Sequence, residues 1–125
     1  MGGNRVLFAA EMDCERPAEG KAPPKAREYL ELKTTKLLAT DRDRATLERH
    51  KMAKWWLQSF LVGVRRVVCG FRDDDGILRK VQDFETRQLP KFVRGAWKPQ
   101  VMLNFGSEAL GWLYDVVVQG PPEGR

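Results

Sequence analysis

The sequence predicts a mixed α/β fold, in which a β-sheet is flanked by helices. Several short runs alternate polar and apolar residues with the period of two that is typical of strands. A long helical pattern separates the second of these runs from the third, and an Asp-Gly turn joins the third to the fourth as a hairpin. The expected order is therefore strand, strand, helix, strand, strand, an irregular stretch and a final helix.

The first two predicted strands cover residues 5–13 and 29–35. Residues 14–27 between them hold three prolines and a glycine among charged side chains, which indicates a loop. Since this loop is longer than most connections between paired strands, we expect it to vary in conformation.

The central helix is expected to start at Thr40 or Asp41, which are good N-cap residues, and to run to Val62, where Gly63 ends it. One of its stripes is apolar and is interpreted as core: Met52, Trp55, Trp56, Ser59 and Phe60. A second stripe is basic and polar, and is interpreted as a solvated face rather than a ligand groove: Arg44, Lys51, Lys54 and Gln58.

The C-terminal half begins with strands at Arg66–Arg72 and 77–84, joined by the turn Asp-Asp-Asp-Gly at 73–76. The aspartates are turn residues, because the spacing and closing glutamate of a calcium loop are missing. Pro99 can open the final helix, which is expected to bury Val101, Phe105, Leu110, Leu113 and Val117. Residues 1–118 form the predicted domain portion, and 119–125 a disordered tail.

Composition limits the classes of protein. With 125 residues the chain is one domain at most, and its net charge of +5 is compatible with a nucleic-acid partner. Two cysteines without a Cys-x-x-Cys pair, and a single histidine, argue against a zinc site and a disulfide scaffold. The longest apolar run is far too short to span a membrane, so no membrane partner is expected.

Two polar patterns carry the chemistry. The period of two puts Glu31 and Lys33 on one strand face, and Glu11 and Asp13 on one face of the preceding strand. If the strands pair, three carboxylates and one ammonium share a small patch, which suits Mg²⁺ or Mn²⁺. Lys33 could hold a phosphate oxygen or the attacking water, as in a metal-dependent phosphodiester or phosphoanhydride hydrolase. The alternative is a solvated strand face with a cross-strand ion pair.

Five segments, in this order along nearly the whole chain, resemble the decapping exoribonuclease family, DXO and its fungal relatives. They are EMDC at 11–14, YLELKT at 29–34, RHKMAKWWLQSF at 49–60, VVCGFR at 67–72 and QVMLNF at 100–105. The resemblance implies a core similar to the PD-(D/E)xK nuclease fold, here corresponding to a C-terminal portion that is incomplete at the N-terminus.

For function, the resemblance implies a nuclear enzyme, with the cytoplasm as a second location, that hydrolyses RNA 5′ ends. Family members remove pyrophosphate and incomplete or atypical caps, including NAD caps, and some degrade RNA 5′→3′. By the family pattern Glu31 and Lys33 are catalytic. The metal ligands, for two divalent ions, are Glu11, Asp13, Glu31 and the Leu32 carbonyl, and the substrate contacts are Lys33 and Gln58.

The pattern is not complete. An arginine motif and a Gly-rich motif ending in a glutamate, which precede the Glu-x-Asp segment in the family, have no counterpart before Arg5. We therefore expect this chain alone to be weakly active or inactive. One alternative is a non-catalytic partner of a nuclear 5′→3′ exoribonuclease. A DNA nuclease of the same broad fold is a weaker alternative, because the Trp-Trp-x-Gln-Ser-Phe string matches the RNA family.

Overall fold

The computed structural model describes residues 1–17 and 28–120. The chain divides into two compact units, one made of residues 9–97 and the other of residues 1–8 with the chain from Lys98 onward. The larger unit holds the sheet and the central helices, and the smaller one holds the long C-terminal helix α4 (Pro99–Gln119).

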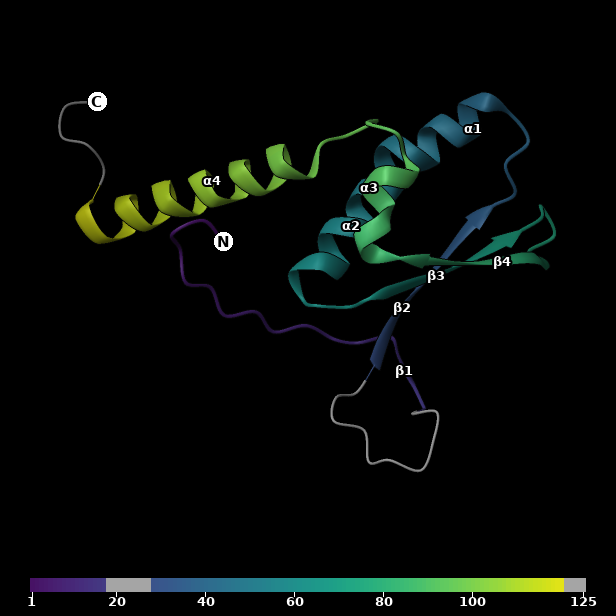
Figure 1. The fold of residues 1–125 in the computed structure, drawn as a ribbon, viewed down its shortest axis with the longest axis horizontal. Helices are drawn as coiled ribbons and strands as arrows, with labels where there is room; N and C mark the ends of the chain where they lie inside the picture. The colour runs from purple at the N-terminus through teal and green to yellow at the C-terminus, as the bar shows by residue number, and fades with distance from the viewer. Residues whose placement is uncertain (18–27, 121–125) are drawn as a thin grey trace. The chain divides into compact units, whose positions relative to one another are not determined.

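The four strands of the sheet lie in the order β1 (Cys14–Arg16), β2 (Glu28–Lys36), β3 (Arg66–Arg72) and β4 (Leu78–Glu85). β1 and β2 are antiparallel, β2 and β3 are parallel, and β3 and β4 are antiparallel. The parallel pair requires a crossover, which the central helix supplies; Figure 1 shows this helix on one side of the sheet. The predicted mixed sheet with flanking helices is confirmed.

The central helix runs continuously through α1 (Asp41–Thr46), the π-helical segment η1 (Leu47–Lys51) and α2 (Met52–Leu61). Thr40 is its N-cap, as predicted. The Thr40 hydroxyl accepts a hydrogen bond from the Asp43 N–H at 3.1 Å, and the Asp43 carboxylate accepts one from the Thr40 N–H at 3.0 Å. Gly63 ends the helix with a φ of +76°, a left-handed value that favours glycine.

The helix and sheet enclose one core. Met52, Trp55, Trp56 and Ser59 are buried, so most of the predicted apolar stripe is confirmed, while Phe60 remains 41% exposed. Trp56 stacks on Phe60 at 4.7 Å and lies 5.5 Å from Trp97. After β4, the irregular stretch forms a 3₁₀ turn, η2 (Thr86–Gln88), and the short helix α3 (Leu89–Phe92), which buries Leu89.

The hairpin between β3 and β4 is confirmed, and its aspartates serve the turn. Asp73 exchanges backbone hydrogen bonds across the turn, accepting from Gly76 and donating to Ile77. Its carboxylate accepts from the Asp75 and Ile77 amides and from Arg79. These hydrogen bonds lower the pKa of Asp73, and the bond from Arg79 has the largest effect.

The prediction of a strand over residues 5–13 is wrong, because the observed strand begins at Cys14. In the β1–β2 register Cys14 lies opposite Leu30, so a longer ladder would place Met12 opposite Leu32. Instead the Leu32 N–H donates to the Asp13 carboxylate at 2.9 Å. An aspartate side chain that takes a ladder hydrogen bond ends the ladder there. Part of the predicted loop is therefore strand, and its residues 18–27 lie outside the described part of the chain.

The final helix is confirmed from Pro99, but its predicted buried side is wrong. None of its residues is buried, and Phe105 and Val117 are 74% and 81% exposed. Among the described residues of its own unit, α4 contacts the N-terminal segment, where the Asn4 amide donates to the Ser107 carbonyl at 3.0 Å. Gln119, predicted to be in the tail, is helical, and residues 121–125 lie outside the described range. No helix of the described residues is long and apolar enough to cross a membrane.

The cap of the central helix gives a first prediction. Thr40→Ala should lower the free energy of unfolding by about 1 kcal/mol, because an orphan amide loses its acceptor. Hydrogen bonds with Thr40 lower the pKa of Asp43, and the bond with the Thr40 side chain has the largest effect. This pKa should therefore rise toward its ordinary value in the variant. Urea unfolding and NMR titration measure the two effects.

The sign of the pH dependence follows from the direction of that shift. A carboxylate with a lowered pKa in the folded state adds stability above its unfolded pKa, about 3.9 for aspartate, and this is lost as the pH falls. The Thr40→Ala variant should therefore lose less stability on acidification than the unmodified chain. An equal loss in both, with an unchanged Asp43 pKa, would contradict this account of the cap.

Candidate active site

The polar face of β2 lies under the central helix rather than in solvent. Glu31 and Thr35 are only 5% and 4% exposed. Along the parallel ladder Glu31, Lys33 and Thr35 lie beside Val67, Cys69 and Phe71, which are all buried. Leu32, on the opposite face, is 49% exposed. The alternative of a solvated strand face is thus excluded for Glu31, because its side chain is buried, in a position where apolar side chains are usual.

Lys33 holds this face together. Its ammonium lies 2.5 Å from Glu31 Oε1 and donates to Gln58 Oε1 at 3.2 Å. Lys33 therefore links a buried carboxylate on β2 to the side chain of an α2 residue. A buried carboxylate is stable only with such a partner, because leaving water without one is costly. The predicted catalytic pair Glu31 and Lys33, and the predicted substrate residue Gln58, are in direct contact.

Asp13, the residue just before β1, contacts the same strand β2. The N–H and C=O groups of a residue in a ladder point to the same strand edge. Because the Leu32 N–H donates to Asp13, the Leu32 carbonyl also faces the β1 edge. The structure thus places the Asp13 carboxylate and the Leu32 carbonyl, two of the predicted metal ligands, along one edge of β2.

Glu11 is not brought into this group. It is exposed, and it lies before the point where the ladder ends at Asp13. Among residues 1–17 and 28–120, no three His, Cys, Asp or Glu side chains are close enough together to hold a metal ion. The expectation that strand pairing gathers three carboxylates into one patch is therefore wrong for this structure. The metal-ligand roles of Glu11, Asp13, Glu31 and Leu32 stay predictions.

The remaining oxygen donors nevertheless suit a hard divalent cation. Asp13, Glu31 and the Leu32 carbonyl offer oxygen atoms only, which Mg²⁺ and Mn²⁺ prefer. Lys33 contacts one Glu31 oxygen, and Leu32 donates to one Asp13 oxygen. Each carboxylate has two oxygens with several lone pairs, so these contacts leave acceptor capacity on both.

The basic and polar stripe of the helix contributes to the site in part. All four of its residues are exposed, as predicted, but two of them reach β2. Gln58 contacts Lys33, and Lys51 donates to Thr35 at 2.8 Å. The involvement of Thr35 was not predicted, although its position extends the Glu31 and Lys33 alternation by one step.

Cys69, beside Lys33 in the ladder, is not a candidate nucleophile. Burial raises the pKa of its thiol to about 11, and Lys51 offsets this only partly. The thiol is therefore neutral near pH 7, whereas a nucleophilic cysteine acts as the thiolate. The groups on this face that can take part in catalysis are therefore the Glu31 carboxylate, the Lys33 ammonium and the Gln58 amide.

Comparisons with known proteins agree with these motifs. Residues 1–124 match the family described as RAI1 like PD-(D/E)XK nuclease. The human decapping and exoribonuclease protein is 39% identical over 126 residues, covering 98% of this chain and 31% of the relative. This chain thus spans about a third of that relative's length.

Solved structures give the same picture of the fold. Rai1 of Scheffersomyces stipitis, crystallised with (3′-NADP)⁺ and a calcium ion, superposes with a TM-score of 0.73 at 29% identity. That match covers 90% of this chain and 29% of the other. Rai1 of Candida albicans, crystallised with pU5-Mn²⁺, has a TM-score of 0.61 at 31% identity over 72% of this chain and 22% of the other.

The contact between Lys33 and Glu31 gives a stability prediction. Lys33→Met should lower the free energy of unfolding by about 2 kcal/mol, because it leaves a buried carboxylate without its cation. Adding Glu31→Gln should recover much of this loss, since the neutral amide needs no cation. Urea unfolding of the two single variants and the double variant measures the coupling.

Lys36→Met is the matched control, because it removes the same charge from the same strand. Lys36 and its partner Asp74 are 67% and 91% exposed in their side chains, so this variant should change stability by less than about 0.5 kcal/mol. Equal losses for the Lys33 and Lys36 variants would contradict the buried-pair interpretation.

Proposed function

Because the chain belongs to the RAI1-like PD-(D/E)XK nuclease family, we propose that it supplies part of the active site of a metal-dependent hydrolase that acts on RNA 5′ ends. The observation that carries this proposal is the contact of Lys33 with both Glu31 and Gln58 beneath the helix. A helix-covered carboxylate in contact with an ammonium supports the proposal that Glu31 and Lys33 are the catalytic pair implied by the family resemblance.

Asp13, Glu31 and the Leu32 carbonyl would hold Mg²⁺ or Mn²⁺, and Glu11 would join them when its segment is held against β2. In such sites two bound ions activate water near neutral pH and stabilise charge on the phosphate. The manganese in the Candida albicans Rai1 structure supports this cofactor.

In the proposed reaction, the chain's own residues position the substrate. The Lys33 ammonium has three donors, and its two contacts hold it at the end of the Glu31 carboxylate. Its third donor would bind a phosphate oxygen or the attacking water. The Gln58 carbonyl oxygen receives a Lys33 hydrogen, so the amide NH₂ of Gln58 would donate to a second phosphate oxygen.

The proposed substrates are 5′-triphosphate ends, incomplete caps and NAD caps, with 5′→3′ degradation as a further activity. A related structure with a nicotinamide dinucleotide supports the NAD-cap part of this range, and one with a phosphorylated oligouridylate supports the RNA part. We also propose a nuclear location, as the family resemblance implies.

A second candidate function is to bind a nuclear 5′→3′ exoribonuclease without catalysis. The exposed apolar side chains of α4 favour it, since surfaces of this kind are common at protein interfaces. Glu31→Ala separates the two functions, because a purely binding role would not change.

The catalytic proposal is tested with 5′-triphosphorylated RNA under single-turnover conditions, so that a weak activity is measured. We expect Mn²⁺-dependent release of pyrophosphate that falls about 100-fold in Lys33→Met and in Glu31→Gln, because the first removes the cation proposed to face the reacting phosphate and the second removes the charge of a proposed metal ligand. Lys36→Met, which removes an exposed lysine from the same strand, should stay within about twofold. Duplex DNA should not be cleaved.

Two results would contradict the proposal. One is unchanged hydrolysis in the Glu31→Gln variant, and the other is hydrolysis by the folded chain that does not require a divalent metal ion. Circular dichroism of each variant confirms that a lost activity does not reflect unfolding.

A further inference from the structure

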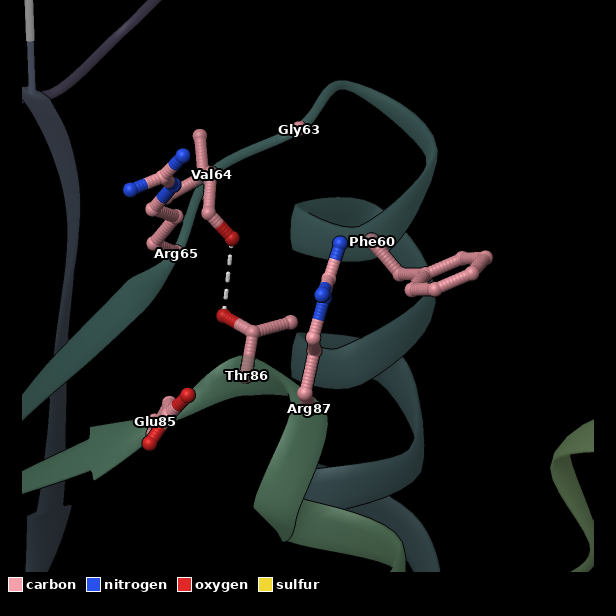
Figure 2. A pocket seen from close by; sticks show the side chains of 7 residues that line it. All are labelled: Phe60, Gly63, Val64, Arg65, Glu85, Thr86 and Arg87. Atoms are coloured by element: carbon pink, nitrogen blue, oxygen red, sulfur yellow. Dashed lines mark hydrogen bonds between the residues drawn. The ribbon is translucent and has the colours of Figure 1, made fainter.

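A cavity of about 460 Å³ lies where α2 turns into β3, outside the group formed by Glu31, Lys33 and Gln58. Its walls come from Phe60 on α2, the turn at residues 63–65, and residues 85–87, where β4 ends and η2 begins. Figure 2 shows these side chains around the hydrogen bond between Thr86 and Val64. A volume of this size is typical of small-molecule and nucleotide sites.

The floor of this cavity is fixed by hydrogen bonds. The buried Thr86 hydroxyl donates to the Val64 carbonyl at 2.8 Å, and the Thr86 amide donates to the Arg65 carbonyl at 2.8 Å. The Val64 amide donates in turn to the Ser59 carbonyl at 2.9 Å. The backbones that carry Arg65 and Arg87 are therefore held rigidly in position, as a preformed site requires.

The cavity carries a positive charge that nothing in the fold uses. Arg65 and Arg87 are exposed, and neither guanidinium has an ion-pair or hydrogen-bond partner among residues 1–17 and 28–120. Glu85 is the one acidic residue of the lining, so the net charge of the walls is positive. The planar fork of an arginine side chain suits the oxygens of a phosphate group.

Phe60 adds an aromatic surface beside the arginines. Its ring stacks on Trp56 with an interplanar angle of 19°, and Trp56 is buried, so the ring is supported from the protein side. Phe60 nevertheless stays 41% exposed. A supported, exposed ring next to cationic side chains is the arrangement that binds single-stranded nucleic acid by stacking a base.

We propose that this cavity binds one nucleotide of a single-stranded RNA, with a phosphate between Arg65 and Arg87 and the base on Phe60. The inference rests on the proposed function, which supplies the RNA. The cavity lies where α2, which carries Gln58, leads into β3, whose Val67 lies beside Glu31 in the sheet. An acidic peptide is a poorer fit, since it has no base to stack on Phe60, whereas RNA also has ribose and base donors from which Glu85 can accept hydrogen bonds.

The test measures fluorescence anisotropy of a 5′-phosphorylated, 3′-fluorescein-labelled pentauridylate, in EDTA to prevent hydrolysis. Arg65→Ala/Arg87→Ala should weaken binding at least tenfold and lower the salt dependence by the equivalent of two phosphate contacts, a slope change of about 1.4. Phe60→Leu, which keeps an apolar side chain without a ring, should weaken binding about fivefold, within the range for one lost stacking contact.

Arg42→Ala/Arg49→Ala is the charge-matched control. Both residues are exposed, lie on α1 and η1, and do not line the cavity. This control should change binding less than threefold. Equal losses of binding in the two double variants would overturn the cavity site. So would displacement of the labelled RNA by decaglutamate at the same concentration at which unlabelled RNA displaces it.

The result is separable from that of the catalytic proposal. If the cavity is wrong but the function is right, Arg65→Ala/Arg87→Ala binds RNA like its control, while hydrolysis remains sensitive to Glu31→Gln. If the function is wrong, any hydrolysis is insensitive to Glu31→Gln, whatever the cavity variants do. Circular dichroism excludes unfolding, which is not expected for exposed arginines.

Discussion

The contact of Lys33 with Glu31 is the constraint on which the rest of the site depends. A carboxylate only 5% exposed lies on the same sheet face as the buried Val67, Cys69 and Phe71. Apolar side chains of similar volume would stabilise the fold at least as well, because burying an ion pair brings little net stability. The charged pair is therefore better explained by chemistry than by folding. Its link to Gln58 ties the same pair to the helix that covers it.

Each surrounding element contributes to holding that pair in place. The parallel pairing of β2 with β3 requires the helical crossover, and the crossover brings Gln58 and Lys51 over the polar face of β2. The Trp97 indole donates to the Glu48 carbonyl at 2.8 Å, which attaches the chain after α3 to the same helix. On the other edge of β2, Asp13 replaces a backbone ladder partner and so ends β1 next to Glu31. The edge that would receive a metal ion thus lies where regular pairing stops.

Much of this arrangement could be predicted from local patterns. The Asp-Gly turn, the helix caps at Thr40 and Gly63, and the alternation of Glu31 with Lys33 depend on nearby residues, and all agree with the structure. The errors concern partners that are distant in sequence. Residues 5–13 have a strand-like pattern, but a strand also needs a ladder, and the Asp13 side chain interrupts it. Similarly, the apolar residues of α4 predict a buried face only if another element covers them. No local signal marks the cavity beside Phe60, because Arg65 and Arg87 are brought together by the fold.

The central claim is that Asp13 and Glu31 form the core of a divalent-metal site, and calorimetric titration with Mn²⁺ tests it most directly. The comparison is between the chain, its Asp13→Ala/Glu31→Ala variant, and Asp74→Ala/Asp75→Ala, which removes two carboxylates from the exposed turn. The account predicts binding by the chain and by the turn variant, and none by Asp13→Ala/Glu31→Ala. Unchanged binding in that variant, or no binding by the folded chain, would contradict it and favour the role as a binding partner.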